Sequence, residues 1–149
     1  MAPTYSPLGP VSACFYGLLS SDQALNTLLA GGVRTDVPES PQFDFLWIEV
    51  LESQQFGGLG TKPGVGALPE VEIRLHVFSA YAGATNAHAA IARAIALVSA
   101  TDVLVVNGYK VAGQEPFHDA TLPLHDQELN GVKCRELVSM HRLYVEELP

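Results

Sequence analysis

The sequence predicts an α+β protein: a single domain with a mixed or mainly antiparallel sheet, helices packed on one face of that sheet, and long loops that project from it. Two neighbouring stretches carry this prediction. Residues 70–81 alternate apolar and polar side chains with a period of two, which is typical of a half-buried antiparallel strand. Residues 84–100 repeat apolar side chains at helical spacing, and their many alanines allow a helix to lie close against a sheet.

Composition limits the kind of protein. A chain of 149 residues with 48% apolar and 16% charged residues fits one globular domain with a core of its own. We expect an N-terminal arm over residues 1–10, where Pro is frequent, and the domain over residues 11–149. The sequence contains no apolar run of about 18 residues and no signal peptide pattern, so we expect no membrane span and no export.

Charge and cysteine content exclude further classes. The formal charge is −8 and the eight Lys and Arg residues are scattered, which argues against a nucleic-acid-binding surface. Cys14 and Cys134 are far apart and belong to no metal or redox motif. We expect two buried free thiols in a reducing compartment, with a disulfide as the alternative.

Two short helices are predicted before the first strand. Residues 11–29 carry an apolar helical stripe that is interrupted at residues 20–22, where Ser21 or Asp22 can cap the second helix. Gly31 and Gly32 then end it, because glycine tolerates the left-handed conformation at a helix end. The following connector contains Pro38 and Pro41 and is predicted to be rich in turns.

Residues 45–51 alternate as a strand that places Trp47 and Glu49 on its outer face. Trp47 is then either covered by a loop or part of a contact between subunits. Residues 54–69 contain five glycines and join two predicted strands, so they are predicted to form the tip of a long hairpin. Loops of this length in a compact domain are usually functional or mobile. They do not match a phosphate-binding motif.

The second half of the chain is predicted in the same way. Thr85 or Asn86 can cap the alanine-rich helix. Asn107 and Gly108 lie between β-branched residues and predict a hairpin over residues 103–111. Residues 114–131 are predicted as a second long excursion from the sheet. Residues 132–147 are predicted as a closing strand, with a β-bulge near residues 141 and 142, where the alternation changes phase.

The sequence contains no recognisable set of catalytic residues, and we expect neither an enzyme nor a cofactor. His118, Asp119, His125 and Asp126 share one segment and are the best candidates for a metal site, although the spacing matches no zinc motif and a solvated acidic loop is the preferred interpretation. The histidines at positions 76 and 88 fall on polar faces and are expected at the surface.

The order and spacing of these segments resemble tail terminator proteins, also called tail-completion or minor tail proteins, of long-tailed bacteriophages and gene transfer agents. The resemblance covers about residues 11–147 and is carried by LLSSDQALNTLLAGGVRTDVPES, FLWIEV, EVEIRLHVFSAYAGATNAHAAIARAIALV and CRELVSMHRLYVEE. The most specific piece is L-H-V-F-S followed by a turn of small residues and an alanine-rich helix. Residues 54–69 are longer and richer in glycine than the family pattern.

The resemblance implies a virion protein without enzymatic activity, assembled in the host cytoplasm. It implies a subunit of a ring, usually hexameric, that caps the head-proximal end of the tail tube. The implied partners are further copies of the chain, the tail tube protein and the head–tail connector, while DNA passes through the bore without specific binding. An acidic chain suits such a bore.

A ring of this kind needs axial and lateral contacts. We expect residues 54–69 and 115–130 to supply the axial contacts. The axial candidates are Gln54, Gln55, Phe56, Leu59, Lys62, Phe117, His118, Asp119, His125 and Asp126. The lateral candidates are Trp47, Arg74 and His76. Three alternatives remain open at this point: a head-completion or connector adaptor protein of the same virion, a small metal-dependent enzyme, and a ligand-binding module with a pocket under Trp47.

Overall fold

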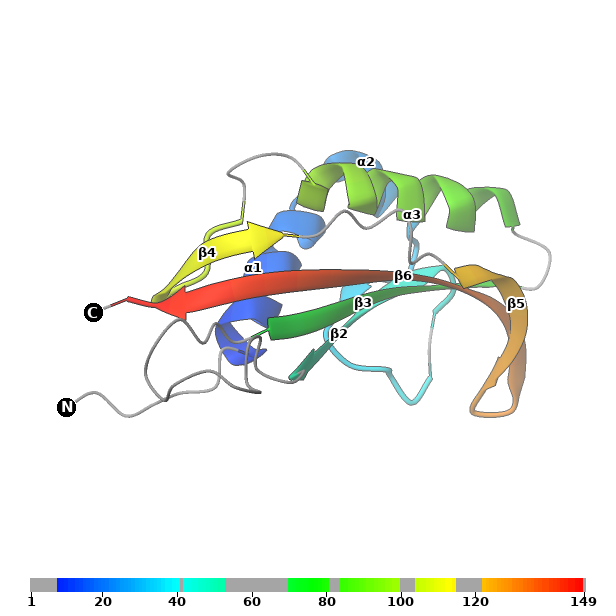
Figure 1. Cartoon of the computed structure of the whole chain (residues 1–149). Coiled ribbons are helices and arrows are strands. Elements are labelled where there is room, and N and C mark those ends of the chain that lie inside the picture. The colour runs from blue at the N-terminus through cyan, green and yellow to red at the C-terminus, as the bar shows by residue number, and fades with distance from the viewer. Residues whose placement is uncertain are drawn as a thin grey trace.

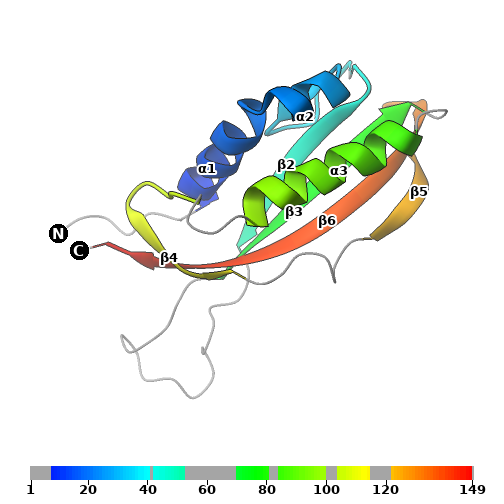
Figure 2. The ribbon, with the colours of Figure 1, turned by 90° about the horizontal axis from the view of Figure 1, so that it is seen from above.

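The computed structural model describes residues 8–40, 42–52, 70–80, 84–99, 104–114 and 122–148. Helices and strands follow one another in the order α1 (Leu8–Ser20), α2 (Gln23–Leu28), β1 (Gly32–Arg34), β2 (Phe45–Glu52), β3 (Glu70–Ala80), α3 (Ala84–Ser99), β4 (Tyr109–Gln114), β5 (Leu122–Leu129) and β6 (Val132–Glu147). The helices lie on one face of a curved sheet (Figures 1 and 2), so the predicted α+β class is confirmed.

The helical region before the sheet is divided into two helices at the predicted position. Asp22 caps α2, because its Oδ2 accepts a hydrogen bond of 2.9 Å from the backbone N–H of Leu25. The chain leaves α2 through Gly32, whose φ of 77° is favourable for glycine. Two boundaries differ from the prediction. Helix α1 begins at Leu8, and α3 begins at Ala84, so that Thr85 and Asn86 lie inside its first turn.

The described strands form one sheet in the order β1-β2-β3-β6-β4, and β5 also pairs with β6. The pairs β2–β3, β3–β6, β4–β6 and β5–β6 are antiparallel, whereas β1 runs parallel to β2. Strand β1 lies at the start of the segment that was predicted as a connector. Its three residues are too few for a pattern of period two to be visible in the sequence.

Strand β6 alternates without a bulge, which corrects the prediction for this strand. Its register against β3 is continuous from Cys134 to Tyr144. Odd-numbered residues of β6 face the helices, and even-numbered residues face the opposite side. The apparent change of phase has another cause: Val138 is buried on the side without helices, while the polar residues Ser139 and His141 are buried beneath the helices. Both faces of the strand therefore exclude water over part of its length.

Strands β4 and β5 lie one after the other along the same edge of β6. Residues 107 and 108 do form a turn, closed by a hydrogen bond of 3.0 Å from the N–H of Tyr109 to the carbonyl of Val106. However, residues 104–106 are not a strand, so the predicted hairpin over residues 103–111 is wrong. Its second arm pairs with β6 instead.

The predicted excursion over residues 114–131 is also wrong in part, because β5 belongs to the sheet. A two-residue turn joins β5 to β6. Asn130 and Gly131 have φ angles of 50° and 83°, as such a hairpin turn requires. This Asn-Gly pair carries the same sequence signal as the pair at 107 and 108.

The main core lies between the helices and the sheet. Its residues come from all three described helices and from β1, β2, β3 and β6, and they include Phe15, Leu25, Ile48, Leu75, Ala94 and Leu143. Alanines of α3 face this core, which agrees with the close packing predicted for a helix with small side chains. Among the described helices, none is both long and apolar enough to cross a bilayer.

Candidate functional site

The face of the sheet that carries no described helix combines aromatic, charged and apolar side chains. Strand β2 places Phe45, Trp47 and Glu49 on this face, since they pair in register with Phe78, His76 and Arg74 of β3. Strand β6 adds Glu136, Val138 and Met140 from the other side of β3. We call this surface the open face.

One end of the open face is an aromatic cluster. The rings of Phe45 and Phe78 stack with centroids 5.1 Å apart, and Phe43 lies 5.8 Å from Phe45. Cys134 is buried in the same cluster, and Val37 and Leu129 pack against it. The segment after β1 and the β5–β6 hairpin thus cover this end, and the side-chain amide of Asn130 joins them by a hydrogen bond of 2.8 Å to the carbonyl of Glu39.

A histidine held between two carboxylates lies next to this cluster. His76 Nδ1 is 2.9 Å from Glu136 Oε2, and its Nε2 is 3.0 Å from Glu49 Oε1. The ring is stacked on Trp47 with centroids 4.5 Å apart. A neutral imidazole has one N–H, so both contacts are hydrogen bonds only when the ring or one carboxyl carries an additional proton. The network joins β2, β3 and β6 through their side chains.

Charge alternates along the rest of the open face. Arg74 forms a close ion pair of 2.8 Å with Glu72 and a longer one of 3.8 Å with Glu49. Arg142 lies 3.3 Å from Glu70. These partly exposed pairs each contribute little to stability, but they make the face polar where the aromatic cluster ends.

The structure brings the three lateral candidates together. Trp47 and His76 are register neighbours, and Arg74 follows on the same face of β3. The expectation that His76 lies at the surface is wrong, because its side chain is buried between Glu49 and Glu136. Trp47 is half-buried: it packs against the aromatic cluster, and it also lines a pocket.

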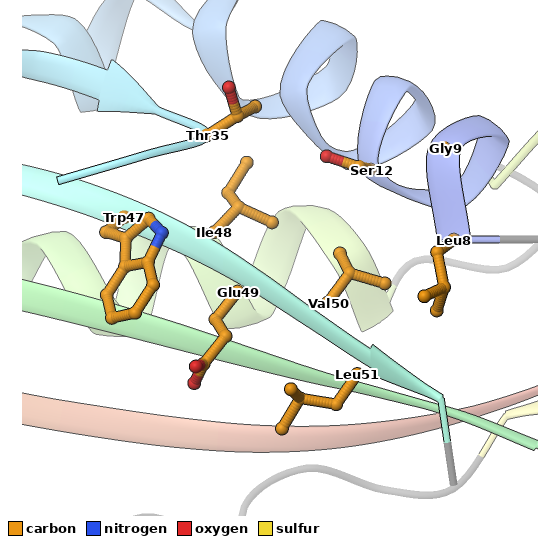
Figure 3. A pocket seen from close by; sticks show the side chains of 9 residues that line it. All are labelled: Leu8, Gly9, Ser12, Thr35, Trp47, Ile48, Glu49, Val50 and Leu51. Carbon is orange, nitrogen blue, oxygen red and sulfur yellow. The ribbon is translucent and has the colours of Figure 1, made fainter.

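That pocket runs along the outer edge of β2 and has a volume of about 420 Å³. Its floor is formed by residues 47–51 of β2, and its opposite wall by Leu8, Gly9 and Ser12 of α1 together with Thr35 (Figure 3). The wall contains both apolar and hydroxyl groups. Side chains from both faces of β2 border it, so it follows the strand edge and does not penetrate the core.

Most axial candidates lie outside the described residues. These are Gln54, Gln55, Phe56, Leu59, Lys62, Phe117, His118 and Asp119. His125 and Asp126 are described, and they belong to β5 and not to a loop. Asp126 is exposed and lies 3.6 Å from Arg135 of the neighbouring strand.

The remaining titratable groups show no arrangement for catalysis within the described part of the chain. No group of three His, Cys, Asp or Glu residues there could hold a metal ion. Both cysteines are free thiols, as expected, but Cys14 is only half-buried. Burial raises the pKa of both thiols, and the nearby Glu136 raises that of Cys134 further. Raised thiol pKa values make reactive thiolates less available at neutral pH.

Sequence reasoning missed the role of Glu136. It recognised Glu49 as an outer-face residue, but it assigned no site role to either glutamate. Glu49 and Glu136 are far apart in the sequence and reach the same histidine only because β2 and β6 flank β3. The available signal was parity: both glutamates fall on the strand positions that alternate with core residues.

The chain is a small α+β domain. Its histidine–carboxylate network and the ion pairs around Arg74 lie on the open face of the sheet. No protein-family model and no curated protein matches the sequence. Among solved structures, the chain is similar in fold to a chain of the structure titled "Virion of native gene transfer agent (GTA) particle". The two chains are 21% identical with a TM-score of 0.68, and the match covers 96% of this chain and 99% of that chain.

Proposed function

We propose that this protein is a structural component of a phage-like particle, and specifically a subunit of a ring that ends the tail tube at its head-proximal side. The observation that carries the proposal is the similarity in fold to a chain of a gene transfer agent virion, which extends over nearly the full length of both chains. A match of this extent means that the whole domain, and not a common substructure, is shared.

The features of the open face support an assembly role over a catalytic one. Its charged residues form ion pairs with one another, and its buried histidine is held by two carboxylates from the neighbouring strands. Such a surface is suited to contact between rigid proteins. In this role the ring contacts further copies of the chain, the tail tube protein and the head–tail connector, and DNA passes through its acidic bore.

The axial contacts are assigned in this proposal to residues 54–69 and to the segment around β5. Residues 115–130 cannot be deleted as a loop, since β5 pairs with β6 along this stretch. The test by deletion therefore uses residues 54–69, replaced by a short Gly-Ser linker. We expect the purified variant to keep its circular dichroism spectrum and its particles to lack joined heads and tails. Infectious particles or transfer-competent particles from this variant would contradict the axial role.

The position in the particle is tested by electron microscopy of particles that contain the protein. Our proposal expects a ring between the tail tube and the head connector. A ring on the portal side of the connector would favour the second candidate, a head-completion or adaptor protein, which the similarity to a virion chain also supports. Absence of the protein from every particle would contradict both.

A further inference from the structure

The outer edge of β2 is covered over only part of its length. Strand β1 pairs with residues 45–47 of β2. No described strand pairs with residues 48–52 on the side away from β3. An edge of this kind presents backbone N–H and C=O groups to any strand that approaches it.

The space beside this edge is a groove and not a packed contact. The pocket of about 420 Å³ lies between residues 47–51 and the first turns of α1 (Figure 3). Leu8 and Val50 are half-buried and Ile48 is buried, so the groove has an apolar lining next to the backbone edge. A strand lies about 4.8 Å from its neighbour in a sheet, and a groove along a strand edge is the form of site that accepts one.

The opposite edge of the sheet is formed by β4. Within the described chain, β4 pairs with β6 alone. Tyr109 and Val111 of β4 pack against the core, whereas Lys110 is exposed on the side of the open face. Among the described strands, the sheet therefore has an incompletely paired edge on each side. One is formed by residues 48–52 of β2 and the other by β4.

Strand direction makes these two edges compatible. Strands β2 and β6 both run antiparallel to β3, and β4 runs antiparallel to β6. Strand β4 consequently runs opposite to β2. If a second copy continues the sheet with its helices on the same side, its β4 meets β2 as an antiparallel pair, and Ile48 and Val50 join the same face as Tyr109 and Val111.

Charge distinguishes this arrangement from symmetric pairs of like edges. Residues 48–52 contain two glutamates and no basic residue, and residues 109–114 contain Lys110 as their only charge. Two β2 edges would oppose glutamates, and two β4 edges would oppose lysines. Opposite charges across strands stabilise a pair, and like charges destabilise it. Glu49, whose side chain is 24% exposed, lies on the same side of the sheet as Lys110.

We propose that neighbouring copies of this chain associate by pairing the β2 edge of one copy, residues 48–52, with β4 of the next copy in the groove beside α1. This head-to-tail contact uses two different edges of each copy, and such contacts close into rings when the rotation between copies permits it. The inference rests on the proposed ring and names the surface that forms it.

The first test is a cysteine cross-link. Cys14 and Cys134 are replaced by Ala, and Leu51→Cys and Lys110→Cys are introduced singly and together. A short thiol-specific cross-linker tolerates a shift of one residue pair in register. We expect the double variant to yield a ladder of covalent dimers, trimers and larger species, and each single variant to remain monomeric in denaturing electrophoresis. Circular dichroism confirms that each variant is folded.

Each other outcome contradicts the inference. Dimers from a single variant would show pairing of like edges, and a double variant without a ladder would show that β2 and β4 do not meet. Negative-stain microscopy of the same samples separates the two proposals: rings without the ladder would leave the ring proposal standing and overturn the edge pairing.

A second test keeps both native cysteines. Lys110→Glu places an acid opposite the acidic β2 edge, and we expect the association constant between copies to fall about fivefold in sedimentation analysis. Lys133→Glu is the matched control, because Lys133 is exposed in the β5–β6 hairpin, away from β4, and the change in net charge is the same. Equal effects of both substitutions would overturn the specific contact.

Discussion

His141 is a buried histidine on the helix-facing side of β6, and the Oγ of Ser139 lies 2.9 Å from its Nε2. Burial lowers the pKa of His141 to about 3. The ring is therefore neutral in the folded protein at neutral pH. In the unfolded chain it takes up a proton near pH 6.5.

This difference predicts acid sensitivity. Because the folded pKa lies below the unfolded value, the stability is complete above about pH 6.5 and falls as the pH decreases from there towards 3, by up to about 1.4 kcal/mol per pH unit. Replacing the pair by Ser139→Ala and His141→Leu should reduce the loss of unfolding free energy between pH 7 and pH 5 by about 2 kcal/mol. Urea unfolding at pH 7 and at pH 5 measures the unfolding free energy of the wild type and of the variant. The exposed His88, changed to Gln, serves as the control for the loss of a histidine side chain.

Gly31 is a residue whose missing side chain is required by the fold. A Cβ at this position would overlap with the carbonyl oxygen of Gln42 and would lie 2.9 Å from Cβ of Phe45. The N–H of Gly31 also donates a hydrogen bond of 2.7 Å to the carbonyl of Asp44, so the two segments cannot separate without losing that contact.

We expect Gly31→Ala to lower the unfolding free energy by about 1–3 kcal/mol, because overpacking against backbone has few ways to relax. The comparison is Gly17→Ala, at an exposed position of α1 where nothing lies within 4 Å of the added carbon. That substitution should stabilise the protein by roughly 0.5–1 kcal/mol through helix propensity. Thermal denaturation of both variants measures these changes in stability. Equal destabilisation by both substitutions would contradict the steric account.

At the scale of elements, Asp22 joins two helices. It caps α2, and its two carboxylate oxygens accept hydrogen bonds of 3.0 and 2.8 Å from the Arg93 guanidinium of α3. Arg93 lowers the pKa of Asp22 most, and the N–H of Leu25 lowers it further. The stability contributed by Asp22 is consequently present above its unfolded pKa and is lost as the pH falls through the lower folded value.

Two substitutions separate the cap from the ion pair. Asp22→Asn retains a good capping group but loses the charge, whereas Asp22→Ala loses both. We expect the melting temperature to decrease in the order wild type, Asp22→Asn, Asp22→Ala. The Asn variant should also be less sensitive to salt than the wild type. A melting temperature of the Asn variant equal to that of the Ala variant would show that the cap contributes nothing.

The elements that the sequence predicts well are those whose pattern is local. Strand β3 and helix α3 each carry a clear period over many residues, and burial follows it along α3 and in β3 as far as residue 75. The sequence does not reveal β5, because a proline and charged residues hide its alternation. The Asn130–Gly131 turn offered a local signal that could have identified the hairpin.

The candidate site was predictable only in part for the same reason. Parity placed Trp47, Arg74 and His76 on one side of the sheet, and the structure confirms that they lie together. Parity does not say which strand flanks β3 on its other side, and so neither the contact between Glu136 and His76 nor the burial of His76 could be inferred. A polar residue in a strand is expected to be exposed, and this expectation fails wherever another polar group satisfies its hydrogen bonds in the interior.

At the scale of the whole molecule, the net charge of −8 governs interaction with DNA. We expect no retardation of duplex DNA by the purified protein, even at low salt, because binding of this kind requires clustered cations that release counterions from phosphate. Electrophoretic mobility shift at several salt concentrations tests this expectation, with a basic DNA-binding protein as the positive control. Retardation that disappears as salt is raised would contradict the proposal that DNA passes through the ring without binding to it.

The central position of β6 also has a consequence for synthesis on the ribosome. Strands β4 and β5 both pair with β6, and β6 supplies the second neighbour of β3 (Figure 2). Until Val132–Glu147 has been translated, three strands that precede it have a backbone edge without its final partner. During that interval the nascent chain is a template for wrong strand pairing. Chains interrupted by premature termination before β6 should therefore be substrates for chaperones and proteases, and not stable fragments.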